Sequence, residues 1–507
     1  MTRLDDGQII REKFFTGILN VGALIAVSIP IFALLGLLGG ATPQQIFEVE
    51  LVCFGSAILA GAQASTLAAW RDKSFQAIAL SIMAVILALL IAEALSAGAQ
   101  AVGRTTDEAQ RLASFISSFR ALQAALNPLP AALAPSVPSA VVYFGVACLG
   151  AATLLAYAAF MLRRWYPQGE PIMQREGVGA DGVAPSEQPY RVVQGNPILW
   201  RETRTAAYGT RTILIKLMYL AICGLVVALA WRDSFGAQLE RNARVKALLK
   251  QSPERAEELL DRSREPGSVG FTAAVVGIAI LCLLLVNAQA ASSITTERDL
   301  KALDLVLATR VTPPEFLAGK LVGALRNMWL PIAVPALLLA AGAWAGLLDW
   351  VGLTYSLVLL ALLVGWAAIL GVHAALRYDT SRIALGHSMG TMFLLFVGML
   401  VCLFLILASG NGRFGAQWAS FLLFIGFGSI GLWLSLSANA PSAAITLAAS
   451  TLPFATFYCI VSFVVGDRTA PFLVGSAAYG FAIAALLVPL LAEFDVATGR
   501  TSHAEGA

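Results

Sequence analysis

Long apolar runs alternate with short charged stretches along most of this chain. A helix rises 1.5 Å per residue and the hydrocarbon core of a bilayer is about 30 Å thick, so a run of about 20 mostly apolar residues predicts one membrane span. Four such runs lie in the first part of the chain, at residues 14–40, 49–70, 74–98 and 140–162. Eight more follow, at residues 209–231, 269–290, 321–347, 352–376, 384–409, 417–437, 442–465 and 471–492. The pattern predicts an all-α polytopic membrane protein with about twelve transmembrane helices.

The composition agrees with a protein that lives in a bilayer. Of the 507 residues, 58% are hydrophobic and 13% are charged, and the mean hydropathy is +0.76. Soluble domains carry about 25% charged residues. The net charge of +3 gives no reason to expect a nucleic-acid partner. The cysteines show no disulfide framework or metal-binding spacing, because all of them fall inside predicted spans: Cys53, Cys148, Cys223, Cys282, Cys402 and Cys459.

Basic residues near the ends of the spans predict the orientation in the membrane, because Lys and Arg concentrate in cytoplasmic loops. The short loops 41–48 and 348–351 contain no Lys or Arg, which places them outside. The basic residues fall on the opposite side, at Arg3, Arg11, Lys13, Arg71, Lys73, Arg163, Arg164, Arg201, Arg204, Arg298, Lys301, Arg310, Lys320, Arg377 and Arg382. We therefore expect both termini in the cytoplasm and a location in a bacterial-type inner membrane.

The polar segments divide the chain into a shorter and a longer transmembrane half. Residues 166–195 are rich in Gly, Pro and polar residues and are predicted to form a cytoplasmic linker. The N-terminal half, 1–165, then has about four spans, and the C-terminal half, 196–495, has about eight, followed by a cytoplasmic tail at 496–507. The first apolar run is longer than the core of a signal peptide and has no convincing cleavage site, so it is expected to be a signal anchor.

An internal repeat is indicated when the sequence is compared with itself at an offset of 307 residues. Alanine and leucine coincidences are common by chance in such a chain, so the polar ones carry the evidence. The matched pairs are Lys13 with Lys320, Asn20 with Asn327, Asp72 with Asp379, Ser74 with Ser381, Ala77 with Ala384, and Ser81 with Ser388. The two halves are therefore predicted to be unequal copies of one unit.

The repeat also preserves a helix start. In VTPPEF, Thr312 is placed to cap a helix, and Glu315 at the third position can close a capping box. At the offset of 307, Asp5 and Gln8 have the same two roles. We expect helices to begin at both places and to enter the membrane past Lys320 and Lys13.

The stretch ITTERDLKALDLVLATR at 294–310 is charged and lies between two apolar runs. On a helical wheel that starts at Glu297, one side is apolar, with Leu300, Leu303, Val306 and Leu307, and the other is charged, with Glu297, Lys301 and Asp304. Asp299 and Leu305 break this pattern. A short cytoplasmic amphipathic helix is predicted, which either rests on lipid or forms a docking surface for a soluble partner.

The following Gly319-Lys320 pair does not form a nucleotide site. A phosphate-binding loop needs the pattern G-x-x-x-x-G-K-[ST]. Here Lys320 is followed by Leu321, and position 314 is proline.

The segment ITTERDLKALDLVLATRVTPPEFLAGKLVG resembles that of ABC transporter permeases of the type 2 export class, in which a Glu-Arg pair, a leucine-rich helix and a Gly-Lys precede a span. NPILWRETR at 196–204 looks like the amphipathic elbow helix that opens a half of such permeases, with Asn196 as its cap and Pro197 as its first residue. The resemblance covers about 196–330 directly and reaches the first half only through the repeat.

The resemblance implies a membrane-spanning permease of an ATP-driven exporter, which is a transport subunit and not itself an enzyme. It implies that Glu297, Arg298, Asp299, Lys301 and Asp304 form the coupling segment that contacts an ATPase. It also implies that Asn196, Trp200, Arg201 and Glu202 belong to the elbow. No Walker A pattern occurs in the chain. ATP and magnesium would therefore be bound by a separate ATPase subunit, expected to be a dimer, and a second permease chain would be a further possible partner beside the lipid bilayer.

Two departures from the family pattern keep alternatives open. The first half has neither the elbow nor the Glu-Arg stretch, so it looks shortened by about 110 residues at its front, which a late or truncated start of the sequence would explain. The second half has about two spans more than the usual six. A secondary transporter with an internal repeat, or a structural or sensory membrane protein, therefore stays as an alternative.

Overall fold

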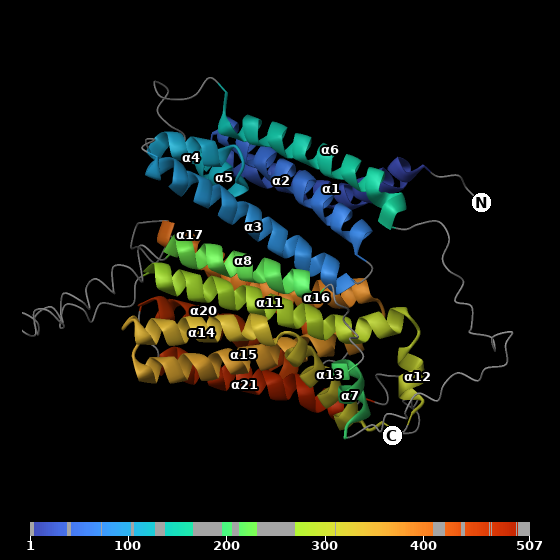
Figure 1. Ribbon diagram of the computed structural model, residues 1–507. Helices are drawn as coiled ribbons and strands as arrows, with labels where there is room; N and C mark the ends of the chain where they lie inside the picture. The colour runs from blue at the N-terminus through green and yellow to red at the C-terminus, as the bar shows by residue number, and fades with distance from the viewer. Residues whose placement is uncertain are drawn as a thin grey trace, which may run out of the picture. The chain divides into compact units, whose positions relative to one another are not determined.

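The structure is a computed structural model, and its long helices run side by side within each part of the chain (Figure 1). The residues that it describes are 5–37, 42–71, 74–102, 106–126, 137–165, 195–204, 212–230, 269–309, 311–408, 421–437, 442–465, 467, 469–492 and 494. The predicted linker at 166–195, apart from Gly195, and the predicted tail at 496–507 lie outside these residues. The chain divides into two compact units, residues 1–192 and 193–507. We call them the N-terminal and the C-terminal unit.

The N-terminal unit is built around one central helix. Its described helices are α1 (Asp6–Leu37), α2 (Pro43–Trp70), α3 (Ser74–Ala101), α4 (Thr106–Ser114), α5 (Ser118–Leu126) and α6 (Ser139–Trp165). Helix α2 packs against α1, α3, α5 and α6. It begins at a capping box, in which Thr42 Oγ1 accepts a hydrogen bond from Gln45 N at 3.3 Å and Gln45 Oε1 accepts one from Thr42 N at 2.9 Å.

The C-terminal unit is larger and is also organised around one helix. Its described elements are α7 (Pro197–Arg204), α8 (Thr212–Ala230), α11 (Val269–Asp299), α12 (Leu303–Leu307), α13 (Pro313–Asn327), α14 (Trp329–Trp344), α15 (Trp350–Arg377), α16 (Ser381–Met392), the π-helix η2 (Phe393–Gly398), α17 (Met399–Ala408), the π-helix η3 (Leu422–Phe427), α19 (Gly428–Ser437), α20 (Ala443–Val465) and α21 (Thr469–Ala492). Helix α11 packs against α8, α13, α14, α15 and α16. It is the most enclosed of the apolar helices, since 72% of its most apolar 18-residue window is buried.

Helix α11 approaches α15 closely and is fixed there by a buried amide. A Cβ added at Gly371 would lie 2.6 Å from Asn287 O, so only glycine allows this approach. The side chain of Asn287 donates a hydrogen bond to Ala367 O at 2.9 Å and accepts one from Ser388 Oγ at 2.7 Å. Amides that join helices in this way are a common device in membrane proteins.

The expected span at 321–347 is two helices rather than one. Helices α13 and α14 meet at Met328 with a bend of 61°. Pro331 explains the break, because proline has no N–H to donate to the carbonyl four residues earlier and its ring collides with that carbonyl. Of the expected span at 417–437, the structure describes residues 421–437, which contain an apolar helix at Leu422–Ser437.

The described residues contain ten helices that are long and apolar enough to cross a membrane, or eleven if the bent pair counts as one span. These described elements are all helical. The chain is therefore an all-α, multi-pass membrane protein.

Helix boundaries coincide at the offset of 307 residues. Adding 307 to the bounds of α2 gives 350 and 377, the bounds of α15. Adding it to the first residue of α1 gives 313, where α13 begins. Within the described residues, both bounds of one helix and the start of another thus coincide at this offset.

Candidate functional site

The helix α7 corresponds to the expected elbow and is capped as the sequence predicts. The side-chain oxygen of Asn196 accepts hydrogen bonds from Ile198 N at 2.9 Å and Leu199 N at 3.1 Å, and Pro197 is the first helical residue. The amide of Asn196 also donates to Glu315 O at 2.6 Å. The cap therefore fastens the start of α7 to the first turn of α13.

Two glycines allow α7 to lie directly against α13. A Cβ added at Gly319 would come within 2.7 Å of the Cβ of Ile198, and one added at Gly323 within 2.8 Å of the Cβ of Glu202. Contacts this short do not occur between real side chains, so both positions require glycine. The glycine of the Gly319-Lys320 pair is thus a packing residue.

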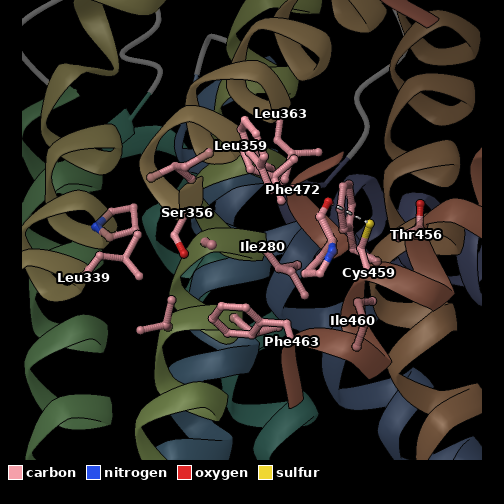
Figure 2. Close-up of a pocket in the computed structure, with 18 of the residues that line it drawn as sticks. Ile280, Leu339, Ser356, Leu359, Leu363, Thr456, Cys459, Ile460, Phe463 and Phe472 are labelled. Atoms are coloured by element: carbon pink, nitrogen blue, oxygen red, sulfur yellow. Dashed lines mark hydrogen bonds between the residues drawn. The ribbon is translucent and has the colours of Figure 1, made fainter. Parts of the chain in front are cut away.

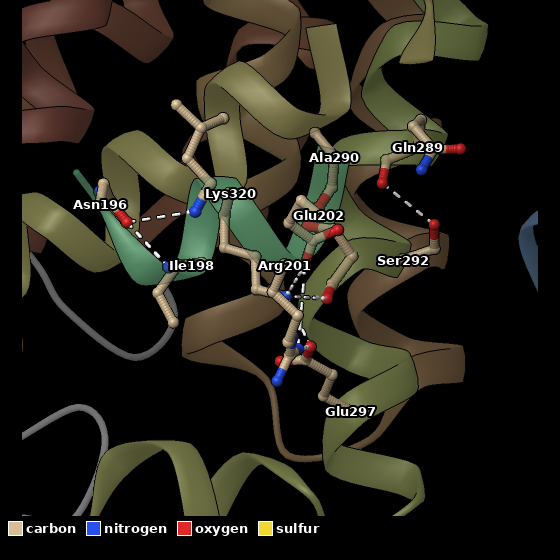
Figure 3. A network of polar contacts seen from close by, with 11 residues as sticks. Asn196, Ile198, Arg201, Glu202, Gln289, Ala290, Ser292, Glu297 and Lys320 are labelled. Atoms are coloured by element: carbon tan, nitrogen blue, oxygen red, sulfur yellow. Dashed lines mark hydrogen bonds and ion pairs between the residues drawn. The ribbon is translucent and has the colours of Figure 1, made fainter. Parts of the chain in front are cut away.

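This packing brings four charged side chains together, which we call the charge network: Arg201, Glu202, Glu297 and Lys320 (Figure 3). Lys320 is fully buried. Its Nζ atom lies 2.6 Å from Glu202 Oε1, 2.8 Å from Glu297 Oε1 and 3.0 Å from Ser293 O. Arg201 forms an ion pair with Glu297 and lies 3.9 Å from Glu202 Oε1. Two cations and two carboxylates balance each other, which is the condition for keeping such charges away from water.

The charge network joins three elements that are far apart in the sequence. Arg201 and Glu202 come from α7, Glu297 from the last turn of α11, and Lys320 from α13. Glu297, which was predicted to belong to the coupling segment, has a side chain that is only 13% exposed and is paired with two cations. The sequence pattern missed this because helix α11 brings Glu297 back against α7.

The short amphipathic helix predicted within 294–310 is divided between two helices in the structure. Helix α11 continues to Asp299 and ends in a Schellman motif, in which Ala302 N donates to Glu297 O at 2.8 Å and Lys301 N to Arg298 O at 2.9 Å. Lys301 is exposed and adopts a left-handed conformation with φ of 54°. The chain turns there, and a second short helix, α12, follows. The side chain of Asp304 lies outside the described residues.

The turn from α11 to α12, residues 299–305, forms a corner with exposed apolar side chains. Leu300 and Leu305 are each 73% exposed, whereas Leu303 and Leu307 are buried. We call this segment the α11–α12 corner. Its exposed leucines stand beside the exposed Lys301, so the corner presents a mixed apolar and charged surface.

The end of α11 is also tied to the corner between α15 and α16. Arg298 donates a hydrogen bond to Tyr378 O, and Ser381 Oγ donates one to Asp299. Arg298 and Asp299, which were predicted to belong to the coupling segment, thus make contacts within the C-terminal unit. They fix the end of α11 on the neighbouring helices.

The remaining predicted site residues are placed as follows. Glu315 accepts hydrogen bonds from Thr312 N at 3.0 Å and Thr312 Oγ1 at 2.9 Å, which confirms the predicted helix start. Trp200 is half-buried on α7. The counterpart residues lie in the N-terminal unit, where Gln8 Oε1 accepts a hydrogen bond from Asp5 N at 3.1 Å at the start of α1. Lys13 is exposed, unlike its counterpart Lys320.

A second feature of the C-terminal unit is an apolar cavity of about 140 Å³ (Figure 2). Its walls come from α11, α14, α15, α20 and α21, together with Phe396 of η2. None of its lining residues is charged. The hydroxyls of Thr456 and Tyr479 are hydrogen-bonded to each other at 2.6 Å, and Cys459 Sγ donates to Pro471 O at 3.4 Å. A pocket with this lining offers water few polar partners and suits apolar molecules. Sequence reasoning missed it because five helices contribute to it.

The described residues contain no group of three or more His, Cys, Asp or Glu side chains that could hold a metal ion. His387 stacks on Tyr378 with ring centroids 4.4 Å apart, and its Nδ1 lies 3.0 Å from Ser435 Oγ. The geometry of this histidine is that of a packed side chain.

Comparison of this chain with protein-family models, with curated proteins and with solved structures finds no match.

Proposed function

We propose that this chain is the membrane-spanning permease of an ATP-driven exporter and that the α11–α12 corner receives the motion of a separate ATPase. The observation that carries the proposal is that the corner is exposed, while the end of α11 next to it is held by several contacts. Leu300 and Leu305 are open to a partner, while the charge network and the contacts of Arg298 and Asp299 attach the end of α11 to α7, α13 and the α15–α16 corner. A displacement of the corner would be passed to several spans at once.

The proposal includes a duplicated architecture in two unequal halves, with twelve membrane passages when the bent pair and the apolar helix Leu422–Ser437 are counted. The coincidence of helix bounds at the offset of 307 supports the duplication. It also includes the inner membrane as location and both termini in the cytoplasm, which follow from the distribution of Lys and Arg. ATP and magnesium would be bound by the partner subunit.

The apolar cavity fits this function as a place for an apolar part of the cargo. It lies among the helices that the corner would move. Helices α11 and α15 line the cavity, and their ends next to the corner are joined by the hydrogen bond from Arg298 to Tyr378 O. Its lack of charged residues excludes a charged group as its occupant.

The experiment that tests the proposal is purification of the full chain in mild detergent from its own membranes. We expect an ATPase with Walker motifs in stoichiometric amount. The variant Leu305→Asp should lose this partner, because a charge replaces an exposed apolar contact, and the fold should persist because the side chain touches little of its own unit. Leu126→Asp is the matched control, since Leu126 is 55% exposed on the short helix α5 and should retain the partner.

Absence of any ATPase from the wild-type preparation, or full retention of it by Leu305→Asp, would contradict the assignment.

A secondary transporter is the second candidate, and one observation favours it. Gln289 is fully buried in α11, and both polar atoms of its amide lack a hydrogen-bond partner among the described residues. Buried polar groups of this kind mark ion or substrate paths in such transporters. Transport driven by an ion gradient in vesicles without ATP would establish this alternative.

A further inference from the structure

Another pocket of the C-terminal unit lies between α16, η2 and α19 and has a volume of about 470 Å³. Pockets of about 300–1,000 Å³ are the usual size of small-molecule sites. One side is a face of α16 and η2 that runs from Ile383 to Leu394, and the other side is formed by Gly431, Leu432 and Ser435 of α19. None of its described lining residues is Asp, Glu, Lys or Arg. We call this space the glycine pocket.

Three glycines of the lining leave space that the fold does not require. A Cβ added at Gly386, Gly390 or Gly431 would meet no atom of the surrounding residues within 4 Å. None of the three has the positive φ that favours glycine. Glycine also lowers the stability of a helix relative to alanine. These positions therefore differ from Gly319 and Gly323, which close packing demands, and their effect is to keep the pocket open.

One end of the glycine pocket has polar side chains that hold each other in place. His387 Nδ1 lies 3.0 Å from Ser435 Oγ, which lies 3.4 Å from Thr391 Oγ1. The His387 ring stacks on Tyr378, whose hydroxyl donates to Ser435 O at 2.6 Å. These contacts fix the ring through one face and through Nδ1. The other ring nitrogen, Nε2, has no hydrogen-bond partner among the described residues and is available to a ligand.

The other end of the pocket is apolar and lies deeper in the span. The segment Ser381–Ile406 is long and apolar enough to cross a membrane. His387 lies about 9 Å along the helix axis from Ser381, and Leu394 lies about 10 Å further along. The headgroup layer is about 5–7 Å thick on each side of the hydrocarbon core. The polar end is therefore near the boundary between headgroups and acyl chains, and the end at Leu394 is among the acyl chains.

The apolar end is built from unusual backbone. Leu394 belongs to the π-helix η2, and a Cβ added at Gly398 of η2 would lie 3.8 Å from Phe424 of the second π-helix, η3. Single π-helical turns are rare and occur frequently at functional sites. Helix η2 also contributes Phe396 to the apolar cavity described above, so it borders both spaces. The π-helices are thus an independent indication that this part of the unit binds a ligand.

We propose that the glycine pocket binds one uncharged, single-chain amphiphile with a hydroxyl-bearing head, of the monoacylglycerol type. The head binds His387 Nε2 and Thr391 Oγ1, and a hydroxyl suits either tautomer of the histidine because it both donates and accepts. The head is uncharged because no described Lys, Arg, Asp or Glu lines the pocket to balance a charge. The chain passes Gly390 and Gly431 toward Leu394, in the direction of the acyl chains. The inference does not depend on the ATPase partner.

The probe is a monoacylglycerol with a diazirine in its chain, added to the full chain in phosphatidylcholine nanodiscs. We expect saturable photolabelling of residues 383–394 or 428–437, located by mass spectrometry. Unlabelled monoacylglycerol should compete with the probe. Lysophosphatidylglycerol of the same chain length should compete much less, because its head carries a charge.

Two variants of the lining test the two ends of the pocket. Gly390→Leu should lower the labelling at least about tenfold, because the new side chain occupies the space of the ligand. The fold should persist, since a Cβ there meets open space. Gly365→Leu is the matched control, because Gly365 of α15 is equally open but does not line the pocket, and it should label like the wild type. His387→Ala should raise the half-saturating probe concentration about fivefold, the effect of one hydrogen bond, and His387→Gln should restore part of it.

Three outcomes would overturn the proposal. Equal labelling of the wild type and Gly390→Leu would mean that bulk lipid alone covers this surface. Labelling that does not saturate would mean the same. Equal competition by lysophosphatidylglycerol would show that the head need not be uncharged. The test of the ATPase partner is separate, because the pocket is measured on the chain alone without ATP, and a permease with an empty pocket would still purify with its ATPase.

Discussion

At the scale of single residues, Lys320 shows how a polar group is placed where its sequence context looks apolar. Its amine is fully buried and reaches two carboxylates and a carbonyl. Burial of the charge is costly unless partners with good geometry surround it. Lys320 therefore depends on Glu202 and Glu297, and each of these depends on Lys320.

We expect Lys320→Met to destabilise the protein by about 3–5 kcal/mol, because the variant leaves two carboxylates with only Arg201 between them. The measurement is thermal unfolding in detergent, where a lower transition temperature is expected. Adding Glu202→Gln to this variant should recover part of the loss, since one of the uncompensated charges disappears. Lys301→Met, at an exposed lysine, is the control and should change little. A double variant no more stable than the single one would show that the two side chains are not coupled.

The sequence predicted the local part of this site and missed its long-range part. The caps by Asn196 and Thr312 follow from residues within a few positions, and they are present. The pairing of Lys320 with Glu202 and Glu297 joins segments 118 and 23 positions apart, and no helical wheel contains it. The small-residue spacing Gly319-x-x-x-Gly323 was the one sequence signal that could have indicated a close helix contact at this position.

At the scale of elements, glycine spacing decides which helices touch. Gly319 and Gly323 place α7 against α13, and Gly371 places α11 against α15. The ends of helices are harder to predict from the sequence. Helix α14 ends at Trp344 and is followed by Gly346 with φ of 78°, whereas α11 ends at Asp299 and is followed by Lys301 in the same left-handed conformation without any glycine. For that reason nothing in the sequence indicates that the predicted helix within 294–310 is interrupted.

We expect Gly319→Val to release α7 from α13, because the new side chain would meet Ile198 and the backbone of Leu199. The measurement uses Ile198→Cys, which replaces a side chain that is 5% exposed, and follows its reaction with a maleimide by site-resolved mass spectrometry. The reaction should accelerate at least about tenfold in the glycine variant. Gly365→Val is the control, since a Cβ there meets no atom within 4 Å, and it should leave the reaction slow. Equal rates in all three proteins would mean that α7 is held by other contacts.

At the scale of the whole molecule, the membrane defines two ends of the C-terminal unit. The end of α11 contacts the α15–α16 corner through Arg298 and Tyr378. Helix α15 then runs away from this corner for 28 residues, and its other end joins α14. Trp344 and Trp350 are 78% and 70% exposed at that joint, which suits the headgroup layer, where tryptophan is enriched.

These positions lead to a topology that can be tested by labelling from one side. Lys301→Cys and Asp379→Cys should react with a membrane-impermeant maleimide only from the cytoplasmic face, because they lie at the basic end of the unit. Trp350→Cys should react only from the opposite face, because the whole of α15 separates it from Asp379. Right-side-out and inside-out vesicles supply the two comparisons, and the wild-type chain measures the background from its own thiols. Labelling of positions 379 and 350 from the same face would show that α15 does not cross the membrane. If positions 301 and 379 react only from the outer face and position 350 only from the cytoplasmic face, α15 would still cross the membrane. The α11–α12 corner would then lie outside, where no ATPase could reach it.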